Sequence, residues 1–387
     1  MKSSLVSACG VFILGLLLSL ALAGCGGVNA NPGPTPTPMP TPPGATPTPT
    51  PAVAHGTFVY FNNSNAQTAG YKLNNDGTLT LLSGSPFAVN GALAAAGNFL
   101  AVASGSTVST FLVDPSSGAL TKAGSGTVVQ GAGGAGIAAD ANNVYVAGSI
   151  PANTSTGIYG FALAANGMLT PLAGSPYVFT QACDFCDVPF VLALNNNFLI
   201  QGGVGFHGVG DFTVYPRGAG GVLAKAQILG TDAEERVAIQ HPVGNFSYAL
   251  NVDDSSLGEF TMDATGKPTP GAQTFTGTGQ DLTVDNSGRF LLVVDNAGVA
   301  HVFTIDPGTG SMSQIGTSEA AGNGATGLAM DPGGHFVVVS QSASSTNLPG
   351  AANQITVFTF DPGSGAMKKL QSYPQPKPPG EVVMVAR

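Results

Sequence analysis

Residues 280–316 read QDLTVDNSGRFLLVVDNAGVAHVFTIDPGTGSMSQIG, and this stretch decides the fold. It contains four short, largely apolar runs, which predict strands near 280–284, 290–295, 299–305 and 311–316. Polar residues and glycines separate the runs, and these residue types favour tight turns. The stretch therefore predicts a small sheet of four strands.

The same pattern recurs along the chain. The turn and strand that begin at Gly288 have counterparts that begin at Gly56, Gly97, Asn142, Asn196, Gly244 and Gly334, at intervals of 41 to 54 residues. A second marker, a strand followed by a glycine-containing turn and another strand, also occurs seven times; its clearest copies are 111–120, 303–312 and 358–367. A four-stranded repeat of this length is one blade of a β-propeller. A blade buries both faces only between neighbours, so the fold class is all-β, a seven-bladed β-propeller.

The ends of the repeat region predict how the ring closes. The first copy, at Gly56, lacks a preceding innermost strand, whereas residues 381–386 form a strand with no blade after it. We predict that this C-terminal strand pairs with the first blade and removes the open edges. An open β-solenoid is the alternative, and it predicts shorter coils without complementary ends.

The N-terminus predicts export. Residues 1–24 carry Lys2 and then an apolar run over 11–23, which is typical of a signal peptide and too short for a permanent membrane span. Leu22-Ala23-Gly24-Cys25 resembles the bacterial lipobox, which implies cleavage before Cys25 and a lipid on its sulfur; an ordinary signal with a chance cysteine is the alternative. Gly26 then favours the outer membrane in bacteria that retain lipoproteins through an aspartate at this position.

A linker follows. Residues 25–54 contain an almost continuous Pro-Thr alternation, which stays extended because proline fixes φ. The predicted organisation is a signal peptide over 1–24, a lipidated linker over 25–54 and a propeller over 55–387. We expect a lipid-anchored monomer of the cell envelope, on the periplasmic face or the cell surface.

The charge and composition of the chain limit the kinds of partner and cofactor that we expect it to bind. Only 9% of the residues are charged and the net charge is −9, without basic clusters, which argues against nucleic-acid binding. We expect no cofactor, since no phosphate-binding loop precedes a predicted helix. The glycine cluster at 131–136 precedes an apolar strand instead.

The repeats resemble lactonase-type seven-bladed propellers, which are related to YVTN-repeat surface proteins. Gly84-Ser85-Pro86-Phe87 and Gly174-Ser175-Pro176-Tyr177 look like a blade-linking motif common in bacterial members. The absence of tryptophan removes the WD40 signature. Some relatives hydrolyse 6-phosphogluconolactone, so the resemblance implies a lactonase-like site.

The resemblance extends to part of a catalytic motif. Matching positions are Arg236, His241-Pro242, Tyr248 and Asn251, while Val237 replaces a histidine and Val252 a glutamate. Hydrolysis of a lactone needs a base to activate water and a cation for the oxyanion. Arg236 and His241 are therefore the candidate catalytic residues of an impaired site, with Asp253 or Asp254 as a substitute carboxylate. The alternative for His241 is a turn residue.

Two further groups of residues, a pair of cysteines and a set of three aspartates, are candidate sites. Cys183 and Cys186 predict a local disulfide outside the cytoplasm; a redox pair would need a helix N-terminus and a zinc site two more ligands. Asp281, Asp285 and Asp295 are candidates to face a central channel and bind Ca²⁺, with solvated turns as the alternative. No complete metal site is predicted.

The leading functional prediction is a binding platform, impaired in catalysis, for an unidentified protein, glycan or small molecule. The alternatives are a lactonase-like hydrolase that uses Arg236 and a structural surface-layer protein. Fold alone does not choose among them.

Overall fold

The computed structural model describes residues 56–63, 66–128, 136–149, 156–178, 188–204, 210–231, 235–251, 255–344 and 350–387. The predicted signal peptide, Cys25, the linker, and the cysteines Cys183 and Cys186 lie outside these ranges. Within them, the one helical segment is the short 3₁₀ turn Ala219–Gly221, and no helix could cross a membrane.

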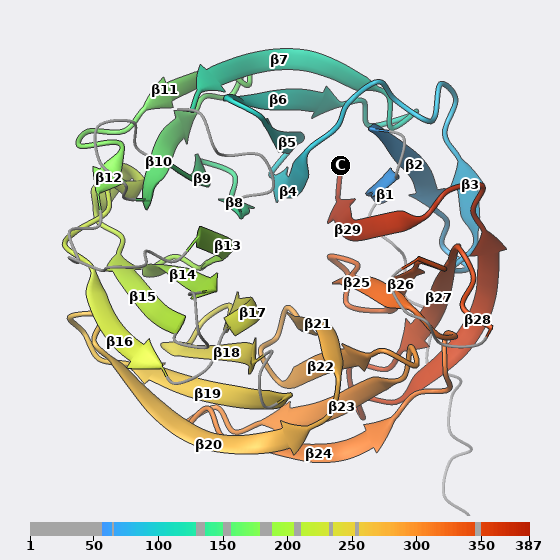
Figure 1. Cartoon of the computed structure of the whole chain (residues 1–387). Helices are drawn as coiled ribbons and strands as arrows, with labels where there is room; N and C mark the ends of the chain where they lie inside the picture. The colour runs from blue at the N-terminus through green and yellow to red at the C-terminus, as the bar shows by residue number, and fades with distance from the viewer. Residues whose placement is uncertain are drawn as a thin grey trace, which may run out of the picture. The chain divides into compact units, whose positions relative to one another are not determined.

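Seven antiparallel sheets form the propeller, each with an innermost strand at the central axis (Figure 1). The first three blades, from the innermost strand outward, are β29 (Pro379–Val385), β1 (Phe58–Asn63), β2 (Gln67–Leu73) and β3 (Leu79–Leu81); β4 (Ala92–Ala96), β5 (Phe99–Ser104), β6 (Thr107–Val113) and β7 (Leu120–Thr127); and β8 (Ile137–Ala139), β9 (Asn143–Ser149), β10 (Thr156–Leu163) and β11 (Leu169–Pro171), with β12 (Tyr177–Val178) also on β10.

The remaining four blades have the same order of strands. They are β13 (Val188–Leu194), β14 (Phe198–Val204), β15 (Gly210–Pro216) and β16 (Gln227–Thr231); β17 (Glu235–Gln240), β18 (Phe246–Asn251), β19 (Ser256–Met262) and β20 (Pro268–Thr276); β21 (Gly279–Val284), β22 (Phe290–Asp295), β23 (Ala300–Ile305) and β24 (Met312–Thr317); and β25 (Ala325–Met330), β26 (Phe336–Gln341), β27 (Gln354–Phe360) and β28 (Met367–Pro374).

The predicted closure is confirmed. β29 pairs antiparallel with β1, with Phe58 opposite Val385 and Val59 opposite Met384. Figure 1 shows the red C-terminal strand beside the blue first strand. Each innermost strand contacts the next around the axis, including β29 with β4 and with β25. The ring therefore closes through non-covalent pairing of the two ends of the repeat region.

The second strand of each blade explains the apolar runs of the sequence. In β22, Phe290 and the four residues after it are all buried, because both faces of the blade pack against neighbouring blades. In the outermost strand β24, Met312 is buried and the next five residues are exposed. Continuous apolar runs therefore mark the strands near the axis, and mixed sequences mark the rim.

Neighbouring blades are also joined by buried tyrosines. Tyr60 donates a hydrogen bond to the carbonyl of Gly118 at 2.5 Å, and Tyr248 donates to that of Gly310 at 2.9 Å. Burial raises the pKa of the Tyr248 hydroxyl, so it remains a donor at physiological pH. Each bond ties the second strand of one blade to the outer hairpin of the next.

The two Gly-Ser-Pro motifs have equivalent places after the outermost strands β3 and β11. The Ser85 hydroxyl accepts a hydrogen bond from the Gly70 amide at 2.9 Å, and Ser175 accepts one from Gly160 at 3.0 Å. Each motif thus fastens the segment that leaves a blade to the third strand of that same blade.

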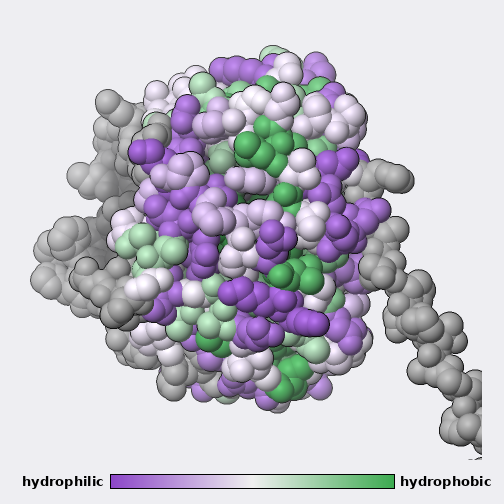
Figure 2. Space-filling model, turned by 90° about the vertical axis from the view of Figure 1, so that its right-hand side faces the viewer, coloured by the Kyte–Doolittle hydropathy of each residue, from purple (hydrophilic) through white to green (hydrophobic). Residues whose placement is uncertain are grey.

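The rim shown in Figure 2 has no continuous apolar patch. Its hydrophobic residues form separate areas among hydrophilic ones. Large exposed apolar side chains such as Leu81 and Ile315 belong to different blades. Isolated exposures of this kind are ordinary on soluble domains.

Candidate functional site

A cavity of about 530 Å³ lies among the innermost strands. Its polar side chains come from β21, β25 and β29, and they are Gln280, Asp281, Thr283, Thr326 and Glu381. The lining from β4, β8 and β13 consists of small or apolar residues, namely Ala92, Ala95, Gly136, Ile137 and Leu192. Among the side chains that the structure describes, the polar chemistry of the cavity is therefore concentrated on three adjacent strands.

Asp281 and Glu381 occupy related positions near the start of their strands. Asp281 follows a β-bulge in β21, and Gly327 follows the corresponding bulge in β25. In β29, Glu381 lies within the bulge that separates Pro379 from Val382. Bulges re-aim side chains and are frequent beside functional sites. Here they bring two carboxyl groups to one wall of the cavity.

Backbone amides hold the Asp281 carboxylate. One oxygen accepts a hydrogen bond from the Leu282 amide at 2.8 Å, and the other accepts one from Leu328 at 2.7 Å. Because Leu328 belongs to β25, this side chain crosses from its own blade to the next. Hydrogen bonds from amides to both oxygens favour the ionised carboxylate.

Glu381 has a different environment. Its side chain is exposed to the cavity, and the innermost strands that line the cavity reduce its hydration. This desolvation, together with the negative charge of Asp281, raises the pKa of Glu381 to about 8. The carboxyl therefore exchanges its proton near neutral pH, as a general acid or base requires.

Gly327 lies on β25, between the strands that carry the two acids. A Cβ at this position would lie 2.8 Å from Ser340 Oγ and 3.1 Å from the Cα of Glu381. A side chain here would therefore require the Ser340 hydroxyl to move and β29 to shift by a few tenths of an ångström. The close approach of β25 to β29 thus depends on glycine, and it keeps this part of the wall between Asp281 and Glu381 free of a side chain.

The predicted residue Arg236 belongs to β17, the innermost strand beside β21. It lies in the bulge between Glu235 and Val237, and Val237 lines the cavity. Its backbone position corresponds to Gln280, which lies in the β21 bulge just before Asp281. The side chain of Arg236 and all of Val252, Asp253 and Asp254 lie outside the described part of the structure.

His241 lies at the opposite end of β17. It lies five positions along the chain from Arg236, or roughly 16 Å at about 3.3 Å per residue. The His241 ring is buried, its Nδ1 accepts a hydrogen bond from the Gly244 amide at 2.7 Å, and its Nε2 donates to the Gly288 carbonyl at 2.8 Å. His241 is therefore held in its turn, at the end of β17 opposite to the backbone of Arg236, and apart from the two acids.

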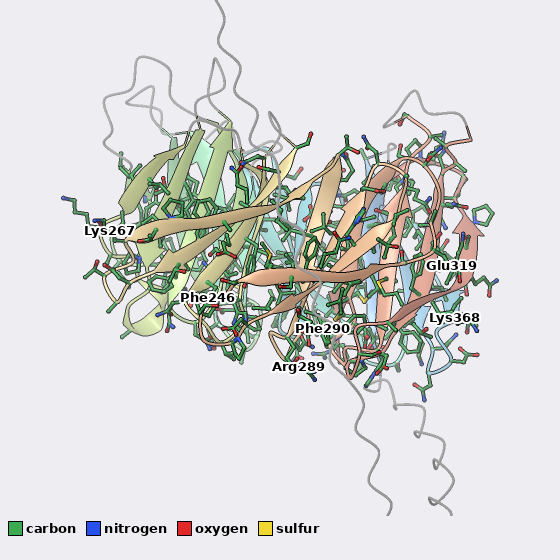
Figure 3. All side chains as sticks on the ribbon, turned by 90° about the horizontal axis from the view of Figure 1, so that it is seen from below. Phe246, Lys267, Arg289, Phe290, Glu319 and Lys368 are labelled. Atoms are coloured by element: carbon green, nitrogen blue, oxygen red, sulfur yellow. The ribbon has the colours of Figure 1, made fainter. Side chains whose placement is uncertain are left out.

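The repeats explain what His241 does. At the same point of the next two blades, Asp285 accepts hydrogen bonds from the amides of Arg289 and Phe290, and Asp331 accepts them from His335 and Phe336. Phe246, Arg289 and Phe290 all lie in the lower part of the propeller in Figure 3, where these turns lie. His241 thus holds the turn that an aspartate holds in the neighbouring repeats.

This equivalence makes a prediction. His241→Ala should lower the free energy of unfolding by about 2 kcal/mol, because it leaves turn amides without an acceptor. His241→Asp should recover at least half of that loss, since an aspartate accepts hydrogen bonds from the amides of the equivalent turns after β21 and β25. Urea denaturation measures both. If His241→Asp is no more stable than His241→Ala, the role in the turn is wrong. If His241→Asp keeps its stability and loses only hydrolytic activity, His241 is catalytic.

The three aspartates predicted as channel candidates separate in the structure. Asp281 lines the cavity, Asp285 holds a turn, and Asp295 forms an ion pair with His301 at 3.0 Å. Within the described ranges, no three His, Cys, Asp or Glu side chains come together as metal ligands.

Glu381 was not singled out as a site residue from the sequence. A signal was present, because it is the one charged residue in an otherwise apolar run that was already predicted to be an innermost strand. Charged residues on such a strand, close to the axis, are rare unless they serve a purpose.

Comparison with known proteins agrees with the fold. Residues 249–384, which include Asp281 and Glu381, match the family model described as lactonase, 7-bladed beta-propeller. A periplasmic gluconolactonase from Pseudomonas aeruginosa superposes with a TM-score of 0.67 at 18% identity, covering 85% of this chain and 99% of that one. A putative 6-phosphogluconolactonase from Bacteroides fragilis gives 0.68 at 17% identity, covering 88% and 100%.

A second putative 6-phosphogluconolactonase, from Bacteroides uniformis, gives a TM-score of 0.67 at 16% identity, covering 86% of this chain and 100% of that one. No curated protein sequence matches this chain. At these identities the structural likeness establishes the fold. The resemblance to lactonase-type propellers noted in the sequence is confirmed.

Proposed function

We propose that this lactonase-type seven-bladed propeller hydrolyses a cyclic ester in its central cavity. The observation that carries the proposal is the position of Glu381 on the wall of the central cavity, on the same wall as Asp281 and with a pKa raised to about 8. Catalytic bases work best when their pKa is close to the working pH. The match of residues 249–384 to the lactonase family model supports the reaction class.

The reaction needs one proton carrier. Glu381, in its ionised form, takes a proton from water while the water oxygen bonds to the carbonyl carbon of the lactone. The tetrahedral intermediate then breaks the ring C–O bond, and Glu381 returns the proton to the departing alkoxide. The products are the hydroxy acid and the unchanged carboxylate, so atoms and charges balance.

Arg236 is the proposed partner for the oxyanion. Its backbone lies at the same end of the innermost strands as Glu381, one residue from the cavity residue Val237. A guanidinium stabilises developing negative charge in hydrolysis of this type. We assign His241 to its turn, because both ring nitrogens are already hydrogen-bonded there.

The location is also part of the proposal. We propose that the signal peptide exports the chain, that Cys25 carries a lipid, and that the Pro-Thr linker joins the anchor to the propeller in the cell envelope. The structural neighbour from Pseudomonas aeruginosa is described as periplasmic, which agrees with export. Incorporation of labelled palmitate into the wild type, and not into Cys25→Ser, is the expected result.

The test of the activity is hydrolysis of a panel of sugar and aliphatic lactones by the purified protein. We expect turnover above the spontaneous rate, rising with pH as Glu381 ionises, with a midpoint near pH 8. Absence of turnover across the panel by folded protein would overturn the proposal. A binding platform, the leading prediction from the sequence, would then be the better interpretation.

A further inference from the structure

We propose that Asp281 is a positioning residue that sets the proton affinity of Glu381 across the gap at Gly327. This inference rests on the proposed function and adds a second residue to the same site. Asp281 would not touch the reacting atoms. It would act through Glu381, by determining the pH at which that carboxyl becomes a base.

The geometry supports a fixed charge at Asp281. Its two oxygens are held by the amides of Leu282 and Leu328, at 2.8 and 2.7 Å, so the carboxylate is anchored on two blades at once. It lines the same cavity wall as Glu381. A charge that is hydrogen-bonded to the backbone on both oxygens loses little freedom, and its field at a neighbouring group is constant.

The strands packed against Glu381 contribute no competing charge. β29 packs against β1, β4, β25 and β26, and none of these strands contains Asp, Glu, His, Lys or Arg within its bounds. Tyr60 on β1 is titratable, but its hydroxyl is bonded to Gly118. Asp331 and Arg387 follow β25 and β29 at the far end of these strands. Asp281 is therefore the charge that faces Glu381 among these described residues.

The consequence for catalysis is specific. Two carboxyl groups on one wall resist joint ionisation, so Glu381 keeps its proton while Asp281 carries the negative charge. Neutralising Asp281 makes ionisation of Glu381 easier, and more of the protein then holds the base form below pH 8. Loss of a purely structural residue would lower activity at every pH instead.

The experiment is the pH–rate profile of Asp281→Asn on the best lactone. We expect the midpoint of the profile to move to lower pH, with activity at pH 6.5 at least about twofold above the wild type. Asp281→Glu, which keeps the charge, should retain the wild-type midpoint. Asp306→Asn is the matched control, because Asp306 is an exposed aspartate in an outer turn of the same blade.

A second readout does not depend on activity. The pKa of Glu381 is raised in the folded state, so the stability it contributes is greatest below pH 4.5 and is lost as pH rises through about 8. The thermal midpoint of the wild type and of Asp306→Asn should fall by a few degrees from pH 5 to pH 8.5. The thermal midpoint of Asp281→Asn should fall less over this pH range. That of Glu381→Gln should not show the part of the fall that comes from ionisation of Glu381.

The outcomes separate the two proposals. If Asp281→Asn has the same pH–rate midpoint as the wild type, and the same fall of the thermal midpoint with pH, the positioning role is overturned. If no lactone is hydrolysed but Asp281→Asn flattens the thermal profile, the coupling stands and the proposed activity fails. Should Asp281→Asn not fold, Asp281→Val takes its place, because Val237 occupies the corresponding position after the bulge of β17.

Discussion

Replacing Glu381 by glutamine is expected to lower kcat/KM for lactone hydrolysis by about 100-fold or more, since a general base contributes about 10² to 10⁴. Glutamine has nearly the same volume and removes only the ability to accept the proton. The fold should be retained, because Glu381 has no hydrogen-bonded partner among the described residues and its charged form is disfavoured in the cavity. Initial rates and a thermal melt of the same sample measure both quantities.

The control for this variant is Glu319→Gln. Glu319 is exposed and lies at the rim in Figure 3, so the same chemical change there should leave kcat/KM unaltered. Arg236→Ala should lower kcat about 100-fold if its guanidinium stabilises the oxyanion. An active Glu381→Gln variant would mean that another group, such as Asp253 or Asp254, activates the water.

Removal of residues 379–387 is expected to abolish cooperative folding of the propeller. β29 buries Val382, Met384 and Val385, and each buried side chain of this size contributes about 1.5–3 kcal/mol. The sum is comparable with the total stability of a typical domain, about 5–15 kcal/mol. The deletion would also turn β1 into an open edge and expose Phe58–Asn63 to solvent.

Circular dichroism on heating and binding of a hydrophobic dye measure this effect. A shorter deletion of Ala386 and Arg387 is the control, because both residues lie beyond the end of β29. It should retain a cooperative transition. A cooperative melt at the wild-type temperature after the longer deletion would show that the ring does not depend on the C-terminal strand.

The sequence was sufficient to predict the architecture. The strands predicted around Phe290 agree with β21 to β24 within one residue at each end. This agreement has a local cause: turns rich in glycine and aspartate limit each strand, and a blade buries both faces. Seven repetitions of such a local signal also reduce the effect of an error in any one copy.

The sequence was less informative about the arrangement of the candidate site. Arg236 and Glu235 belong to the expected innermost strand, but His241 lies at its other end and holds a turn. Arg236 and His241 were grouped because they are close in sequence and both match part of a family motif. In the structure, the length of β17 separates the backbone of Arg236 from His241. Asp281 was one of three aspartates with equal claims, and only the fold distinguishes the cavity residue from the turn residues.

What the sequence by itself determined was the number of blades, the order of the strands and the closure by the C-terminal strand. These depend on short-range patterns and on the need to bury apolar faces. What only the tertiary structure decided was the meeting of Asp281 and Glu381, which lie one hundred residues apart in the sequence and come from different blades. Their interaction depends on desolvation and on the approach of strands at the axis, and neither quantity is encoded in the spacing of residues along the chain.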